Sequence, residues 1–86
     1  MTAELIFTVP FAEDLRAQVT WLRAQSRASW VEKLQGDLED AYRVLEEFPR
    51  AGVATDTRGR KLVLRNMPFA IRYVLEADDT RVVLLS

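Results

Sequence analysis

A chain of 86 residues with 49% hydrophobic and 29% charged side chains has the composition of one small globular domain; it is too short for a second domain and too apolar for a disordered protein. The absence of cysteine and histidine excludes disulfides and thiolate metal sites, and it removes the commonest general base and the commonest metal ligand. The net charge is only −1, no apolar run approaches the ~20 residues of a membrane span, and no signal peptide opens the chain, so we expect a cytoplasmic protein without a membrane partner.

Residues 3–9 predict a first strand. Leu5, Phe7 and Val9 alternate with Glu4 and Thr8, as in a strand that buries one face.

A first helix is predicted to follow. Pro10 fixes the backbone angle of a first helical turn. Apolar residues at helical spacing then give the helix one buried face, namely Phe11, Leu15, Val19 and Leu22. Trp21 lies on the flank of that face, and we interpret it as a residue at the edge of the core.

A second helix is predicted to run from Ser29 to about Glu47. Ser29 and Glu32 fit a capping box in which Ser29 is the N-cap. The apolar face of this helix consists of Val31, Leu34, Leu38, Ala41, Leu45 and Phe48. Its polar face consists of Glu32, Lys33, Asp37, Glu39, Asp40, Arg43, Glu46 and Glu47. The two helices are therefore expected to form an antiparallel hairpin packed on a sheet.

The stretch "LEEFPRAG" (45–52) ends the second helix. Pro49 cannot continue a helix and disfavours helical geometry at Phe48, and Gly52 allows the turn that follows. We still expect Phe48 to point to the core.

The remaining chain predicts a polar loop and three strands. The loop covers 50–59, with a short extended piece at 53–55. Strands are predicted at 61–65, 69–76 and 81–85, with Phe69, Ile71, Tyr73 and Leu75 on one side of the middle one. The predicted fold is α+β, with the order β-α-α-β-β-β, one possible extra short strand, and a helical hairpin on one face of an antiparallel sheet.

The register of the first two of these strands determines what the other face carries. With a two-residue turn at 67–68, Arg65 opposes Ala70 and Val63 opposes Arg72. The face away from the helices then carries Lys61, Val63, Arg65, Ala70, Arg72 and Val74. Such a basic face with aliphatic patches suits a partner that is partly acidic and partly apolar, and a merely solvated sheet face is the alternative.

Charge is unevenly distributed along the chain. Residues 1–48 carry 5 basic and 9 acidic side chains, whereas residues 49–86 carry 7 basic and 4 acidic ones. A basic patch for an anionic partner and ordinary basic loops are both compatible with this imbalance.

Four segments in linear order resemble the RelE/ParE toxin superfamily. They are "AEDL" entering the first helix, "LEEFPRAG" closing the second, "GRKLVL" opening the hairpin, and "MPFAIRYVLEADDTRVVLL" through the last strands. The resemblance covers nearly the whole chain. It implies a compact bacterial or plasmid-encoded toxin of a type II toxin–antitoxin system, as in plasmid stabilisation, which an antitoxin wraps and neutralises.

Two activities occur in this superfamily. RelE-like members cleave mRNA on the ribosome, and ParE-like members poison DNA gyrase without chemistry. The arginine that RNA-cleaving relatives place on the penultimate strand would fall at Ala70 or Ile71, and Arg72 is one or two places away. The low net charge also disfavours ribosome binding. The resemblance therefore favours a ParE-like, non-enzymatic inhibitor of gyrase; a RelE-like endoribonuclease and a non-toxic antitoxin-binding member are the alternatives.

Members of the superfamily normally continue past the last strand with a short tail of the pattern hydrophobic-x-His-x-Arg. The sequence stops at Ser86, before that pattern, so residues 1–86 are expected to form a single domain that lacks the tail. The family's first strand pairs beside its last strand. The core should therefore stand without the tail, whereas any activity that the tail carries should be weakened.

The resemblance also assigns roles to residues. The target-binding surface would consist of Arg58, Arg60, Lys61, Arg65 and Arg72. Arg60 matches a recurrent arginine of the family, and capping of the preceding loop is its alternative role. Tyr73 matches a strand tyrosine that we interpret as core and not as a catalytic acid. No catalytic residue, metal or cofactor is assigned.

The partners implied are a cognate antitoxin and, as target, DNA gyrase, with no sequence-specific DNA binding by the toxin alone. The antitoxin would lie in a groove along the helical hairpin and the sheet edge. Its candidate anchors are Trp21, Trp30 and Tyr42, because aromatic residues dominate such contacts.

Overall fold

The computed structural model of the chain describes residues 2–25, 28–55 and 58–86. The elements in chain order are β1 (Glu4–Phe7), α1 (Val9–Ala24), α2 (Ala28–Glu47), β2 (Val53–Ala54), β3 (Arg60–Val63), β4 (Ala70–Glu76) and β5 (Arg81–Leu84). This is the predicted α+β order with the extra short strand present as β2.

The strands form one five-stranded sheet in the order β1-β5-β4-β3-β2. β2, β3, β4 and β5 pair antiparallel, as predicted. β1 runs parallel to β5, so the sheet is mixed and the prediction of a purely antiparallel sheet is wrong in this one pairing. The first strand does pair beside the last.

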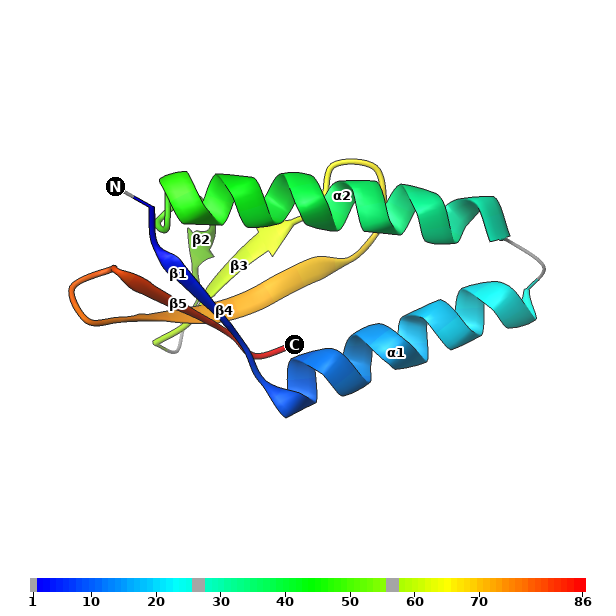
Figure 1. Cartoon of the computed structure of the whole chain (residues 1–86), viewed down its shortest axis with the longest axis horizontal. Coiled ribbons are helices and arrows are strands. Elements are labelled where there is room, and N and C mark those ends of the chain that lie inside the picture. Colours follow the sequence, from blue (N-terminus) through cyan, green and yellow to red (C-terminus); the bar gives the residue numbers. More distant parts are fainter. Residues whose placement is uncertain (1, 26–27, 56–57) are drawn as a thin grey trace.

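The two helices pack against one face of this sheet, and both extend beyond it (Figure 1). The molecule is consequently elongated, with principal extents of 42 × 21 × 20 Å. The C-terminal end of α1 and the N-terminal end of α2 lie far from the β4–β5 turn, at the opposite end of the long axis.

Thr8 connects the first strand to the first helix. Its hydroxyl accepts a hydrogen bond from the Phe11 N–H (3.3 Å) and donates one to the Leu84 carbonyl (2.6 Å). Thr8 is thus the N-cap of α1, and the helix begins at Val9. The prediction that the strand continues to Val9 is therefore wrong, and Val9 is exposed.

The core lies between the helices and the sheet. On α2 the predicted apolar face is confirmed at five positions, all buried: Val31, Leu34, Leu38, Ala41 and Leu45. The sheet contributes the fully buried Ile71, Tyr73, Val82 and Leu84, so the predicted helix-facing side of β4 is also confirmed.

Four predictions about single side chains are wrong. Phe48 is 64% exposed, because the chain turns away at Pro49 before its ring can reach the core, and Trp21 is 56% exposed rather than at the core edge. Asp37 is buried although it was assigned to the polar face. Ser29 does not precede α2 as N-cap, because the helix already begins at Ala28.

The β3–β4 register differs from the predicted one by two residues. Lys61 opposes Arg72 and Val63 opposes Ala70, because the connection between the strands spans residues 64–69 rather than two residues. A shift of two positions leaves the paired residues of β3 and β4 on their predicted faces, whereas Arg65, also predicted for the open face, lies beyond the end of β3. The predicted residue pairs are therefore wrong, but the assignment of the paired residues to the two faces of the sheet is correct.

Within the described ranges, neither helix is both long enough and apolar enough to cross a membrane.

Candidate functional site

The sheet has one face without helices, which we call the open face. Alternation from the buried Ile71 and Tyr73 directs Arg72 and Val74 of β4 to this face, and pairing adds Lys61 of β3 opposite Arg72. A half-exposed apolar row lies beside the two cations, formed by Ile6, Val83 and Val74 on three adjacent strands. The open face thus combines positive charge with aliphatic surface, as predicted.

Lys61 and Arg72 line a hollow of about 530 Å³ at one end of the open face. Its lining consists of Thr55, Gly59, Arg60, Lys61, Arg72, Tyr73, Leu85 and Ser86. Like charges directly opposite each other on paired strands repel. In the part of the chain that the structure describes, neither of the two cations has a carboxylate within ion-pair distance. An anionic group entering this hollow would relieve the repulsion.

Arg60 has a different environment from Lys61. It faces the helix side of the sheet, where its Nη1 donates to the carbonyls of Gly52 (2.7 Å) and Arg50 (3.2 Å). Its guanidinium therefore caps the loop between α2 and β2, and loop capping is the alternative role that the sequence allowed for Arg60. Arg60 reaches the hollow only as part of its wall.

Tyr73 completes the attachment of this loop. Its buried hydroxyl accepts a hydrogen bond from the Gly52 N–H (2.9 Å) and donates one to the Pro49 carbonyl (2.8 Å). Burial raises the pKa of Tyr73, against the smaller lowering effects of the Gly52 hydrogen bond and the Arg60 charge, so the phenol stays protonated at neutral pH. This geometry supports a structural role of Tyr73 in the core.

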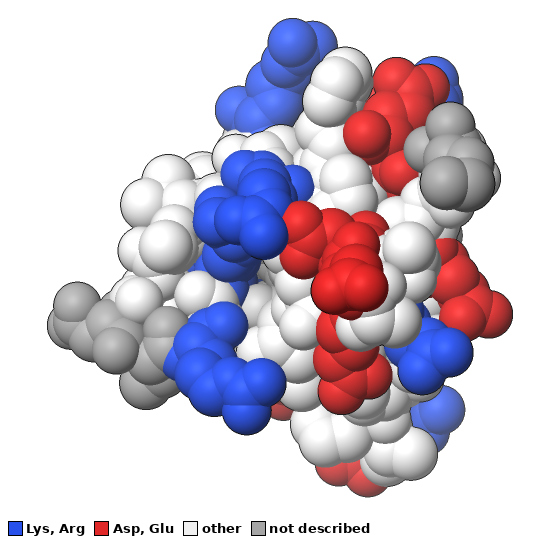
Figure 2. All heavy atoms as spheres, turned by 90° about the vertical axis from the view of Figure 1, so that its left-hand side faces the viewer, with Lys and Arg blue, Asp and Glu red and all other residues white. Residues whose placement is uncertain are grey.

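The five cations predicted for the target surface do not form one cluster. Arg58 is exposed in the loop before β3, and Arg65 is exposed in the β3–β4 connection. Only Lys61, Arg72 and the wall residue Arg60 come together. Figure 2 shows the end of the molecule that carries the β4–β5 turn, where Lys and Arg side chains gather mainly on one half of the view and Asp and Glu on the other.

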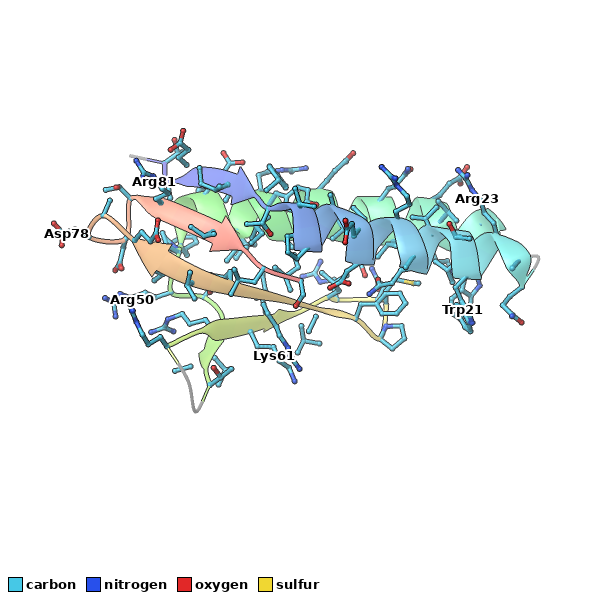
Figure 3. The ribbon with its side chains drawn as sticks, turned by 90° about the horizontal axis from the view of Figure 1, so that it is seen from below. Trp21, Arg23, Arg50, Lys61, Asp78 and Arg81 are labelled. Carbon is cyan, nitrogen blue, oxygen red and sulfur yellow. The ribbon has the colours of Figure 1, made fainter. Side chains whose placement is uncertain are left out.

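The three aromatic residues predicted as antitoxin anchors are also dispersed. Trp21 lies near the far end of α1, well away from Lys61 on β3 (Figure 3). Tyr42 is half-buried against Phe7 (ring centroids 5.2 Å apart), and Trp30 is half-buried on α2 with the Lys33 ammonium 5.6 Å from its ring. They do not define one groove.

A groove does lie along the sheet edge, between the C-terminal half of α2 and β3. We call it the α2–β3 groove; its volume is about 420 Å³. It is lined by Asp37, Asp40, Ala41, Arg43, Val44, Glu47, Phe48, Leu62, Val63, Leu64 and Arg65. The exposed Phe48, Val44 and Val63 were not predicted as functional, and Pro49 was the signal available, since a proline directly after Phe48 turns the chain away from the core.

Asp37 also lines this groove and was not predicted as buried. Its carboxylate accepts hydrogen bonds from the Asn66 N–H, the Asn66 side-chain amide and the Met67 N–H, each at 2.8 Å. Burial by itself raises the pKa of Asp37, but these hydrogen bonds and the charge of Arg65 outweigh burial and hold the pKa below its ordinary value. Asp37 therefore fixes the β3–β4 connection against α2.

Comparison of the chain with protein-family models, with characterised proteins and with solved structures finds no match. Its fold and its surfaces are accordingly the basis for a functional proposal.

Proposed function

We propose that this protein is a ParE-like toxin of a type II toxin–antitoxin system, which inhibits DNA gyrase by binding through the open face and which a cognate antitoxin neutralises. The proposed activity is binding to gyrase alone, and the protein catalyses no reaction in this proposal.

One observation carries the proposal: β1 pairs beside β5, with a helical hairpin on one face of the sheet and a basic, partly apolar opposite face. The resemblance to the RelE/ParE superfamily implies this placement of the first strand beside the last. A protein surface with acidic and apolar groups would complement Lys61, Arg72 and the adjacent Ile6–Val83–Val74 row.

Supercoiling of relaxed plasmid by purified gyrase tests the proposed target. The purified chain should inhibit supercoiling in a dose-dependent manner, and prior mixing with the protein encoded beside it should remove the inhibition. Unchanged supercoiling at a large molar excess of the chain would argue against gyrase as the target.

A RelE-like endoribonuclease is a second candidate, and the position of Arg72 favours it. Arg72 shares a hollow with Lys61 beside the end of the last strand, where two cations could stabilise the charge that develops on a phosphate during RNA cleavage. Specific cuts in translated mRNA in a purified translation system, without an effect on gyrase, would select this candidate over the first.

A further inference from the structure

The outer face of α1, turned away from the core, carries a large apolar side chain. Trp21 lies there and is 56% exposed, which leaves much of its ring in water. Its neighbours Ala17 and Ala24 are also exposed and too small to cover the ring. The face contains a hollow of about 570 Å³, lined by Glu13, Arg16, Ala17, Thr20, Trp21 and Ala24. It therefore offers both apolar surface and space for another helix.

The charges of this face are complementary to the same face in reverse direction. Glu13 lies near the start of α1, and Arg23 lies near its end. Arg16 and Thr20 lie between them at spacings of three and four, so all four side chains follow one flank of the helix. Figure 3 shows Trp21 on the opposite flank from Arg23. In the described part of the chain, Glu13, Arg16 and Arg23 form no ion pair.

A twofold axis between two antiparallel copies of α1 satisfies these charges. Such an axis brings each flank of one helix against the same flank of the other, so Glu13 of each copy can face Arg23 of the second copy. In this register Ala17 lies next to the axis, where its small side chain lets the helix axes approach to about 8 Å. Trp21 then packs beside Ala17 of the second copy and leaves water.

We propose that the outer face of α1 pairs antiparallel with the same face of a second copy of this chain, with Trp21 as the apolar contact and two Glu13–Arg23 ion pairs. One helix pair is smaller than a standard interface of about 1,600 Å², so the dimer is weak and reversible. The inference does not depend on gyrase as the target, because the open face is built from strands and stays free in this dimer.

Sedimentation velocity of the purified chain between about 10 µM and 1 mM tests the proposal. The average mass should rise with concentration towards that of a dimer, and Trp21→Ala should prevent the rise. A chain that stays monomeric over this range, or one whose association ignores Trp21→Ala, would overturn the proposal.

Charge reversal tests the direction of pairing. Glu13→Arg sets like charges against each other at both ends of the interface and should weaken the dimer about fivefold or more, as should Arg23→Glu. The double variant exchanges the two charges and should dimerise like the wild type. Glu39→Arg makes the same charge change at an exposed position of α2 and is the matched control without effect. A double variant as weak as the single variants would contradict the proposed pairing.

The chain has no cysteine, so an introduced one reports the register. Ala17→Cys sets the two thiols about 3 Å apart along the helix axes, within reach of a disulfide, whereas Ala24→Cys sets them about 18 Å apart. Under mild oxidation, Ala17→Cys should form a covalent dimer about tenfold or more faster than Ala24→Cys. Equal rates for the two variants would refute this register.

Discussion

Asp37 is the charged side chain that the described part of the chain buries, and its replacement should be costly. Asp37→Ala leaves the N–H groups of Asn66 and Met67 without their acceptor, one of them buried. An orphaned buried donor costs about 1–3 kcal/mol, so we expect a loss of about 2–3 kcal/mol in the free energy of unfolding. Urea denaturation at neutral pH measures it. Asp40→Ala, an exposed neighbour on the same helix, should change stability little.

The same residue gives stability a defined pH dependence. The folded-state pKa of Asp37 is below its ordinary value, so the ionised form contributes stability above the unfolded-state pKa of ~4. This contribution is lost as the pH falls through the folded-state pKa. In denaturation series at decreasing pH, wild type and Asp37→Ala should converge in acid. A constant difference between them down to pH ~2 would contradict the assignment.

Gly36 offers a stabilising change. It lies inside α2, and a Cβ built on it would meet no atom within 4 Å. Alanine favours a helix interior over glycine by up to ~1 kcal/mol, so Gly36→Ala should raise the free energy of unfolding by about that amount. Thermal denaturation should show a higher midpoint. A lower midpoint would mean that a side chain at position 36 disturbs packing, contrary to the open space around Gly36.

At the scale of elements, the loop after α2 depends on Tyr73 and Gly52. Tyr73→Phe removes a hydroxyl that both accepts from Gly52 and donates to Pro49, and it should cost about 1–3 kcal/mol. Gly52→Ala should also destabilise, because its Cβ would lie 2.6 Å from the Tyr73 hydroxyl and 2.9 Å from the Lys61 carbonyl oxygen.

The double variant tests that these two residues act together. Phenylalanine at position 73 removes the hydroxyl at 2.6 Å, but the Lys61 carbonyl oxygen and the ring Cε1 atom, each at 2.9 Å, remain. Gly52→Ala should therefore cost less in the Tyr73→Phe background than in wild type, without becoming neutral. Strictly additive losses in urea denaturation would show that the tyrosine hydroxyl does not limit space at Gly52.

The β4–β5 turn contains backbone strain that one substitution should relieve. Ala77, Asp78 and Asp79 all have positive φ angles, of 53°, 55° and 66°. Alanine has no side-chain hydrogen bond to favour this conformation, so Ala77→Gly should stabilise by about 0.5–1 kcal/mol. The Arg50–Asp79 ion pair at the same turn lies on the surface and should contribute less. Chemical denaturation of Ala77→Gly that shows a loss of stability would contradict this reading.

At the scale of the whole molecule, periodicity predicted the order of elements and the two faces of the sheet. The apolar spacing on α2 and the alternation on β4 each report one buried face, and that face survives a register shift of two residues. The predicted β3–β4 pairing was wrong. The length of the connection depends on hydrogen bonds that the N–H groups of Asn66 and Met67 donate to Asp37, which is far from both residues in the sequence.

The candidate site was less predictable than the fold. The positions of Lys61 and Arg72 on the open face follow from alternation alone, since each lies an odd number of residues from the apolar side chains of its own strand that face the helices. The choice between the two roles considered for Arg60 could not be made from the sequence, because it depends on a loop carbonyl that the fold brings to its guanidinium. The burial of Asp37 could have been predicted. Asp37 is three residues after Leu34 and four before Ala41, so helical spacing places it on the buried face of α2.

The central claim is that this domain inhibits gyrase through the open face of its sheet. The most direct measurement compares inhibition of gyrase supercoiling by the wild type, by Lys61→Glu/Arg72→Glu and by Arg16→Glu/Arg23→Glu. The third variant makes the same change in charge on exposed positions of α1. We predict that the wild type and the α1 variant inhibit alike and that the open-face variant is weaker by about tenfold or more. An inactive wild type, or equal inhibition by all three proteins, would contradict the account.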